Sequence, residues 1–358
     1  MAVSASDTAK VCTLPEGTDS DQGARRAGLV FSADCLPGIR RLRRGDAFEY
    51  RHDEGLPLSA EDLDRIAQLH VPPAWTDVWI CDDERGHLQA TGRDAKGRKQ
   101  YRYHAMWRAV RDESKYGRLL EFGEALPRIR RRVDRDLRER SLNRRKVLAL
   151  VVALLDEGLV RVGNAQYARQ NASFGLTTLR DEHARVGAAK VQLRFRGKAG
   201  KELTVGVDNP RIARAVRRVR DLPGHELFQY MDERGELHVV ESGHVNQYLH
   251  EIANRDITSK DFRTWGGSLA VARALHASAA GAPSTHVVSE AIREAASVLG
   301  NTPAVCRKAY VHPGLIDLYS AGGFEAAWEH ARRNEPSRPY LHADERVFLG
   351  VLRALSER

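Results

Sequence analysis

The chain has 358 residues, of which 42% are hydrophobic and 29% charged, a composition typical of a soluble globular protein. At this length two domains can each bury a hydrophobic core. Lys and Arg number 57 against 48 Asp and Glu, and the formal net charge of +9 favours a polyanionic partner, nucleic acid first.

The N-terminal segment and the cysteines indicate the compartment. Residues 1–28 are polar, contain no apolar signal-peptide core and are expected to form a flexible tail. The four cysteines form no CxxC pair, so we expect free thiols in a reducing compartment. No apolar run approaches the roughly 18 residues of a membrane span. The sequence therefore predicts a cytoplasmic protein without a membrane anchor.

Residues 29–108 are expected to form a small β-rich domain. A helix begins at Ser59, and a strand at 78–81 turns through 82–86 into a second strand at 87–91. The domain ends in a basic and aromatic stretch, 92–104. Its cations can neutralise phosphates, and its amide and aromatic side chains can reach base edges or stack. A charged hairpin loop would have a similar composition.

Residues 109–358 are expected to be mainly helical. Between residues 128 and 146 there are ten basic and three acidic side chains, and apolar residues at helical spacing leave the basic ones free to face either a polyanion or solvent. Arg161 lies among apolar residues and needs an anion or other acceptors, which a structural ion pair would also supply. A β-hairpin over 191–207 presents Lys198 at its tip.

The last motif carries a candidate nucleophile. A helical pattern stops at Gly300, and Thr302-Pro303 marks the start of a short helix that contains Tyr310. Neighbouring cations can stabilise the phenolate of such a tyrosine, although packing or surface exposure would also explain its position. Arg263 lies near the start of a preceding helix, predicted from Ser259 through Leu275.

Five separated motifs occur in this order: GRKQYRYH, LVRVGN, RFRGKAGKE, KDFRTWG and LGNTPAVCRKAYVHP. With them, roughly residues 45–320 resemble the poxvirus-like type IB DNA topoisomerases, of the bacterial branch. The resemblance implies an α+β fold, in which a small β-rich N-terminal DNA-binding domain (29–108) is joined to a larger, mainly α-helical catalytic domain (109–358) with a short antiparallel sheet. Tyrosine recombinases share this catalytic fold.

The resemblance also implies residue roles. Tyr310 matches the nucleophile, Arg161 and Arg263 match the phosphate-stabilising arginines, and Lys198 matches the general acid. Asn301 stands where the family has a histidine; its amide can donate a hydrogen bond to phosphate but can neither carry charge nor transfer a proton. The expected DNA-binding residues are Arg98, Lys99, Gln100, Tyr101, Tyr103 and Tyr167. Asn164 replaces a lysine of the poxvirus enzymes, so their site preference does not transfer.

The implied activity is relaxation of positive and negative supercoils. Tyr310 would cut one strand, forming a 3′-phosphotyrosyl link and a free 5′-hydroxyl, and religation would reverse the step without ATP, metal or another cofactor. The expected partner is double-stranded DNA clamped by a monomer, and the expected location is cytoplasmic, at the nucleoid.

Other readings are less consistent with the motifs. A tyrosine recombinase usually has His-x-x-Arg where this chain has Lys260 through Arg263. A non-catalytic nucleoid protein would not need Arg161, Lys198, Arg263 and Tyr310 together. A zinc hydrolase is disfavoured because there is no HExxH, and a P-loop enzyme because 197–201 is too short and lacks the Ser/Thr.

Overall fold

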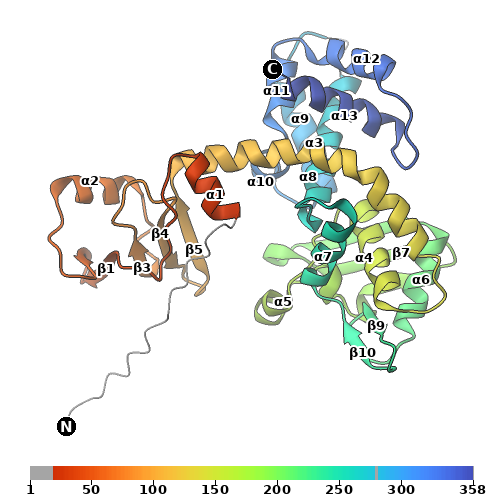
Figure 1. Cartoon of the computed structure of the whole chain (residues 1–358), viewed down its shortest axis with the longest axis horizontal. Coiled ribbons are helices and arrows are strands. Elements are labelled where there is room, and N and C mark those ends of the chain that lie inside the picture. Colours follow the sequence, from red (N-terminus) through yellow and green to blue (C-terminus); the bar gives the residue numbers. More distant parts are fainter. Residues whose placement is uncertain (1–18, 279–280, 358) are drawn as a thin grey trace. The chain divides into compact units, whose positions relative to one another are not determined.

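The computed structural model describes residues 19–278 and 281–357, except for the side chains of 19–22 and 108–116. The chain divides into two compact units, residues 1–115 and 116–358 (Figure 1). The first unit is built on a sheet and the second is mainly helical, which confirms the predicted fold class. The division falls inside a helix, seven residues beyond the predicted end of the first domain at 108, because one continuous helix runs through it.

The smaller unit contains a five-stranded antiparallel sheet in the order β2-β1-β3-β4-β5. Its elements are α1 (Asp19–Arg26), β1 (Ile39–Arg44), β2 (Ala47–His52), α2 (Ala60–Gln68), β3 (Thr76–Ile80), β4 (Leu88–Arg93), β5 (Lys99–Tyr103) and the start of α3 (Ala105–Asp136). Helix α2 begins where predicted, because the Ser59 hydroxyl accepts from the Asp62 amide and the Asp62 carboxylate accepts from the Ser59 amide. Ile66 of α2 packs on Ile39, Val78 and Ile80 of the sheet.

The tail predicted for residues 1–28 is wrong for its last part, while residues 1–18 lie outside the described residues. Helix α1 is ordered, and Ala24 and Ala27 are buried with Leu29 against Trp107. A Cβ at Gly23 would lie 2.8 Å from the Trp107 ring. Small side chains let this helix approach an indole closely, and a pattern of small residues carries no hydrophobic signal in the sequence.

The larger unit is mainly α-helical. It contains the rest of α3, α4 (Arg144–Gly158), α5 (Ala165–Asn171), β6 (Ala184–Val186), β7 (Lys190–Arg196), β8 (Glu202–Asp208), α6 (Pro210–Arg220), β9 (Gln229–Met231), β10 (Leu237–Val239), α7 (Ser242–Ala253), α8 (Ser259–Ala277), α9 (Thr285–Val298), α10 (Pro303–Tyr310), α11 (Pro313–Ser320), α12 (Phe324–Asn334) and α13 (Ala343–Ser356). Strands β6, β7 and β8 form an antiparallel sheet, and β9 pairs with β10.

Two buried helices, α4 and α8, form the centre of the larger unit. Every residue of α4 from Lys146 to Leu155 is buried, and α8 buries Phe262, Trp265, Leu269 and Leu275. Helix α8 contacts both α9 and α10. The residues carried by α8 and α10 are therefore held by the core rather than by surface loops.

The basic run at residues 128–146 is partly structural, which corrects the expectation that its cations are free to face a polyanion. Arg130 forms ion pairs of 2.6 Å with both Asp156 and Glu345. Arg132 pairs with Asp136 at 2.7 Å. These carboxylates come from α3 itself and from distant helices, so sequence charge counts did not reveal that the cations are neutralised.

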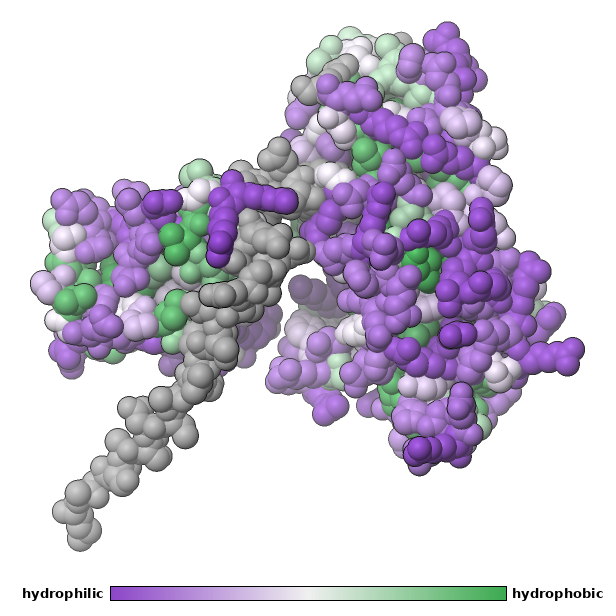
Figure 2. All heavy atoms as spheres, viewed as in Figure 1, coloured by the Kyte–Doolittle hydropathy of each residue, from purple (hydrophilic) through white to green (hydrophobic). Residues whose placement is uncertain are grey.

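The remaining surface is mostly polar. Figure 2 shows hydrophilic residues over much of the visible face of the larger unit. None of the helices in the described residues is both long and apolar enough to span a bilayer. Cys81 and Cys306 are buried free thiols, whereas Cys35 is disulfide-bonded, so the expectation of free thiols is wrong at Cys35.

Candidate active site

Tyr310 is the last residue of the short helix α10. Pro303 occupies the first turn and the Thr302 hydroxyl accepts from the Val305 amide, as the sequence predicted. Gly300, with φ of 63°, ends the preceding helix in the left-handed conformation that favours glycine. Tyr310 is only 8% exposed, so a role as nucleophile requires that the substrate reach a hydroxyl that is nearly buried.

Arg263 of α8 lies against the Tyr310 ring, with its guanidinium carbon 4.9 Å from the ring centroid. Its Nη1 donates to the Leu159 carbonyl and its Nη2 donates to the Leu299 carbonyl at 2.8 Å. The Nε is buried without a partner among the described residues. Two carbonyls thus fix the guanidinium, no described carboxylate pairs with it, and its Nε–H is left for an additional acceptor.

Ser268, one turn beyond Arg263, fixes the end of α10. Its hydroxyl donates to the Tyr310 carbonyl at 2.9 Å and accepts from the His312 amide at 3.0 Å. The side chain is fully buried. Ser268 therefore satisfies two backbone groups where α10 stops, and these would otherwise lose hydrogen bonds.

Gly267 lets α8 approach the end of α10. A Cβ at this position would lie 3.1 Å from both the Tyr310 Cβ and the Tyr310 carbonyl oxygen. The absence of a side chain at Gly267 therefore allows α8, the helix that carries Arg263, to pack closely against Tyr310.

Arg161 and Asn301 meet although they are 140 residues apart. The Arg161 Nη2 donates to the Asn301 Oδ1 at 2.6 Å. The Asn301 Nδ2 is buried and has no partner among the described residues. The backbone of Arg161 is held by the Leu176 amide, which donates to its carbonyl at 2.9 Å. Arg161 therefore orients the amide of Asn301 so that its donor is left free.

Lys198 lies where the hairpin was predicted. Strands β7 and β8 pair in register, with a short 3-10 helix over Lys198–Gly200 between them. Lys198 is exposed and makes no hydrogen bond or ion pair with any described residue. The structure therefore does not bring its amine into the cluster formed by Arg161, Arg263, Asn301 and Tyr310.

Leu203 of β8 brings the hairpin close to that cluster. A Cβ at Gly197 and a Cβ at Gly300 would each lie 2.6 Å from Leu203 methyl groups. Gly197 immediately precedes Lys198, and Gly300 immediately precedes Asn301. One leucine thus packs between the backbone segments that carry these two side chains.

The electrostatic environment favours ionisation of Tyr310. Burial alone would raise the pKa of the Tyr310 hydroxyl, but the charges of Arg263, Arg161 and Lys260 more than offset burial and leave that pKa below its ordinary value. Burial also lowers the pKa of Arg263, although an arginine stays protonated at neutral pH. The cluster therefore combines a hydroxyl whose anion is stabilised with fixed cations around it.

The expected DNA-binding residues of the smaller unit lie on β5 and the turn before it. Tyr101 is 47% exposed and stacks on Tyr103, with ring centroids 6.0 Å apart. The cations are partly engaged, since Arg98 pairs with Asp94 at 2.6 Å and Lys99 pairs with Asp34 at 2.5 Å.

Two further expected DNA contacts differ in their surroundings. The Gln100 amide donates to Asp94 at 2.9 Å, so it must exchange that partner to contact a base. Tyr167 lies in α5 of the larger unit and is half-buried; the Asn164 side chain accepts from its amide at 2.8 Å and caps that helix.

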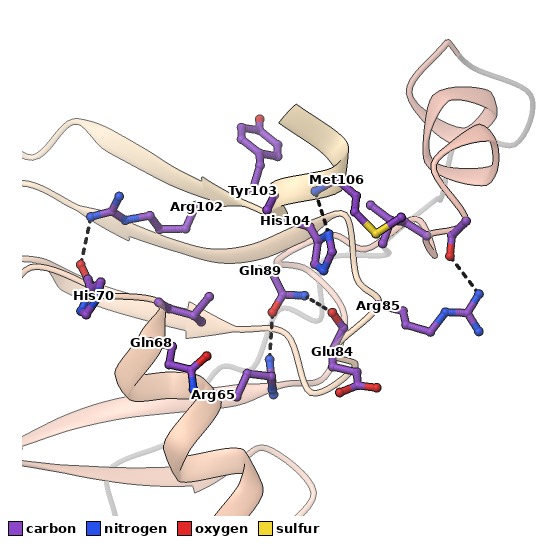
Figure 3. Close-up of a pocket in the computed structure, with 14 residues that line it drawn as sticks. Arg65, Gln68, His70, Glu84, Arg85, Gln89, Arg102, Tyr103, His104 and Met106 are labelled. Atoms are coloured by element: carbon purple, nitrogen blue, oxygen red, sulfur yellow. Dashed lines mark hydrogen bonds between the residues drawn. The ribbon is translucent and has the colours of Figure 1, made fainter. Parts of the chain in front are cut away.

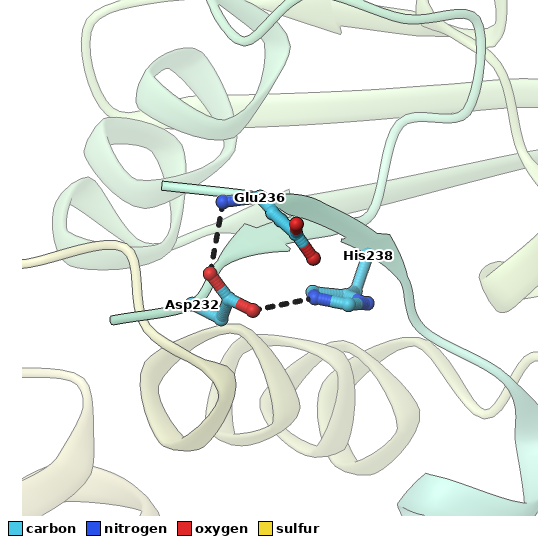
Figure 4. Close-up of side chains that lie close together, drawn as sticks. All are labelled: Asp232, Glu236 and His238. Carbon is cyan, nitrogen blue, oxygen red and sulfur yellow. Dashed lines mark hydrogen bonds and ion pairs between the residues drawn. The ribbon is translucent and has the colours of Figure 1, made fainter. Parts of the chain in front are cut away.

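Two groups of acidic and histidine side chains were not found from sequence. One is Asp232, Glu236 and His238 (Figure 4), and the other is His276, Glu325 and Glu329. In the first, the Asp232 carboxylate accepts from the Glu236 amide at 2.8 Å and lies 2.9 Å from the His238 Nε2. These bonds organise the turn between β9 and β10, which accounts for the cluster without an ion.

Sequence reasoning also missed Ser268, Gly267 and Leu203. The first two directly follow the KDFRTWG motif, and that proximity was the only local signal. Nothing near Leu203 in the sequence distinguishes it from an ordinary strand residue, because one of its two partners, Gly300, lies in a distant loop.

Comparisons with known proteins match most of the chain to a single group of enzymes. A family model described as eukaryotic DNA topoisomerase I, catalytic core, matches residues 104–323, and one described as bacterial DNA topoisomerase IB, N-terminal domain, matches residues 47–94. DNA topoisomerase 1B of Acanthamoeba polyphaga mimivirus is 33% identical over 79% of this chain and 88% of its own. DNA topoisomerase I of Monkeypox virus and DNA topoisomerase 1B of Vaccinia virus (strain Copenhagen) are each 22% identical over 72% of this chain and 82% of their own.

Proposed function

Because the chain belongs to the type IB DNA topoisomerases, isomerases that act on DNA, we propose that it relaxes positive and negative supercoils through a transient single-strand break. In this proposal Tyr310 forms a 3′-phosphotyrosyl link, the cut strand rotates, and religation restores the duplex without ATP or a metal ion. The energy of the broken phosphodiester is kept in the new one, so no external source is needed.

The observation that supports this proposal best is a pair of unused buried donors. The Arg263 Nε and the Asn301 Nδ2 are both buried without partners in the described part of the chain. A buried donor without an acceptor costs about 1–3 kcal/mol, and a ligand that supplies the missing acceptor would remove this cost. Arg263 lies against Tyr310, and Asn301 is bonded to Arg161. The non-bridging oxygens of a phosphodiester suit these donors.

The proposed cleavage step follows from these groups. The Tyr310 oxygen attacks phosphorus and loses its proton to water, the new bond from phosphorus to the tyrosine oxygen forms, and the bond to the 5′-oxygen breaks. Arg161, Arg263 and Asn301 stabilise the charge on the non-bridging oxygens. Lys198 protonates the leaving 5′-oxygen after DNA binding brings the hairpin to the scissile phosphate.

Religation is the reverse of this step. The 5′-hydroxyl attacks phosphorus, the neutral amine of Lys198 takes its proton, and the tyrosine oxygen leaves. Since the pKa of Tyr310 is lowered, its anion is a better leaving group than an ordinary phenolate. The same arrangement therefore favours both directions.

The form of the DNA partner and the cellular location are further proposals, which membership of the family does not by itself establish. The net charge of +9 supports duplex DNA as the substrate and an association with the nucleoid of the cytoplasm. We propose that a monomer acts on each duplex, because Arg161 already meets Asn301, and Arg263 already meets Tyr310, within a single chain.

Relaxation of supercoiled plasmid tests the proposal. Wild type should relax plasmids of either sign in EDTA and without ATP, and Tyr310→Phe should bind DNA but leave it supercoiled. Relaxation by Tyr310→Phe would refute the assignment of the nucleophile. A wild-type protein that binds DNA but does not relax it would favour the non-catalytic alternative.

A further inference from the structure

Lys146, near the start of α4, is a buried cation that the catalytic proposal does not use. The residue is only 6% exposed, and its ammonium group donates to the Glu139 carbonyl. Among the described residues it forms no ion pair with a carboxylate. An ammonium group has three N–H donors, so two of them remain for another acceptor. A buried charge without a counter-ion is strongly unfavourable, and an anion from outside the chain would remove this cost.

Arg218 of α6 is a second cation beside Lys146. Its Nη2 donates to the Arg140 carbonyl at 2.8 Å, while Lys146 donates to the carbonyl of the residue before, Glu139. These consecutive carbonyls hold the two cations near each other. Burial lowers the pKa of Lys146, the charge of Arg218 lowers it further, and Glu139 offsets only part of this effect. In the described part of the chain Arg218 also has no carboxylate partner, so nothing neutralises the pair.

Lys146 and Arg218 line a cavity of about 350 Å³ between the segment that follows α3, the start of α4 and helix α6. One carboxylate, that of Glu139, and six cationic side chains border it: Arg138, Arg140, Lys146, Arg211, Arg214 and Arg218. Arg138 and Arg211 share the carboxylate of Asp134, which does not border the cavity. The side chains of Arg140 and Arg214 form no hydrogen bond or ion pair with any described residue. The cavity therefore keeps an excess of positive charge.

A cavity of about 620 Å³ in the smaller unit does not concentrate charge in this way (Figure 3). Its three arginines, Arg65, Arg85 and Arg102, point to separate parts of the space. Arg65 also lies 3.7 Å from the Asp62 carboxylate and donates to the Gln89 side chain at 3.0 Å. The close approach of two unneutralised cations thus distinguishes the cavity beside Lys146.

We propose that the cavity beside Lys146 binds a polyphosphate anion. Several cations around one small space match an anion with several charges better than a single carboxylate, and guanidinium groups offer paired donors to phosphate oxygens. The groups of a polyphosphate chain are joined through one oxygen, whereas those of DNA are separated by a sugar, so the chain fits a compact cavity better. None of the described residues that line the cavity is aromatic, so we expect a nucleotide base to add little affinity.

This site is separate from the proposed cleavage cluster. Helix α6 packs on α4, β6 and β7, whereas Arg263 and Tyr310 lie on α8 and α10. The bound anion would join α4, α6 and the segment after α3 through cations that otherwise repel one another, so it should stabilise the larger unit. The proposal goes beyond supercoil relaxation and does not depend on the role of Tyr310.

Isothermal titration calorimetry on the full chain tests the proposal. Inorganic triphosphate is titrated into wild type, Lys146→Met, Arg218→Gln and the control Arg217→Gln. Arg217 is a matched control because it is an exposed arginine of the same helix, donates to one carbonyl, that of Gly187, at 2.8 Å, and does not border the cavity. Each variant loses one positive charge, so the control accounts for net charge. Affinity should fall at least about tenfold in both cavity variants and stay unchanged in the control.

Thermal unfolding gives a second measurement. Triphosphate should raise the Tm of wild type and Arg217→Gln, because a ligand that binds only the folded state stabilises it, and should raise the Tm of the cavity variants less. Arg218 is exposed, so Arg218→Gln is informative even if Lys146→Met folds poorly. A nucleoside triphosphate distinguishes the sources of the anion. Equal affinity assigns the phosphate chain alone, and tighter binding that the same variants lose assigns a nucleotide.

Two results would overturn the proposal. One is an equal affinity for triphosphate in all four proteins. The other is an absence of triphosphate binding together with a weaker salt dependence of duplex binding in the cavity variants alone, which would assign these cations to DNA. Plasmid relaxation by the same proteins reports separately on the catalytic proposal.

Discussion

Arg161 donates a hydrogen bond of 2.6 Å to the side-chain oxygen of Asn301 and thereby turns the amide nitrogen of Asn301 away from itself. That nitrogen has no partner among the described residues. The resemblance to the poxvirus-like enzymes implies that Asn301 takes the place of a histidine of that family. The arrangement suggests that the residue at this position acts as a hydrogen-bond donor, whose direction Arg161 sets.

Substitution of Asn301 tests that role. Asn301→Ala removes the donor and should slow single-turnover cleavage by roughly tenfold to a hundredfold, the effect of a lost hydrogen bond to a charged group. Asn301→Asp keeps an acceptor for Arg161 but replaces the donor by a negative charge, so cleavage should be slower still. Cleavage by Asn301→Asp at the wild-type rate would show that the donor is not used.

Ser268 should position Tyr310 without touching DNA. Ser268→Ala leaves the Tyr310 carbonyl and the His312 amide without their partner, so the end of α10 is no longer fixed. We expect the cleavage rate to fall roughly tenfold while the dissociation constant for duplex DNA stays the same. Ser289→Ala is the matched control, since that hydroxyl is exposed and, among the described residues, bonds only to the Thr285 carbonyl of its own helix. Equal rates for both variants would contradict the positioning role.

Lys198 should act on the leaving oxygen. Lys198→Ala should slow cleavage of ordinary DNA by roughly 10²- to 10⁴-fold, the usual contribution of a general acid. On DNA with a 5′-bridging phosphorothiolate the loss should be much smaller, because sulfur leaves without protonation. Lys201→Ala, at the other end of the same turn, is the control. The same loss on both substrates would remove Lys198 from the acid role.

The pH dependence of cleavage should follow the Tyr310 hydroxyl. Its pKa lies below the ordinary value of about 10, so the rate should rise with pH and level off below that value. Lys260→Gln removes one of the cations that lower this pKa, and should move the profile toward higher pH. Lys308→Gln, at an exposed lysine of α10, should leave it in place. A profile that Lys260→Gln does not move would show that another group controls the rate.

Local patterns were sufficient to predict several elements. The start of α2 at Ser59, the start of α10 at Thr302-Pro303 and the hairpin that carries Lys198 are all confirmed, because caps, turns and strand alternation act over a few residues. The resemblance supplied the residues of the candidate site, and their catalytic roles stay predictions.

Contacts between distant segments could not be predicted in this way. Arg161 was expected to need an acceptor, but nothing near it in the sequence pointed to Asn301. Arg130 appeared to belong to a basic face, although Asp156 and Glu345 neutralise it. Helix α1 was missed because small residues packing on Trp107 give no periodic apolar signal.

Leu203 makes three positions of the chain dependent on one another. Its methyl groups fill the space beside Gly197 and Gly300, which lie next to Lys198 and Asn301. A larger residue at either glycine requires the Leu203 side chain to move or to be replaced by a smaller one, and at Gly300 the left-handed backbone is a further restriction. We therefore expect substitutions at these three positions to occur together during evolution. This packing links the segment that carries the proposed acid, Lys198, to the segment that carries the proposed phosphate donor, Asn301.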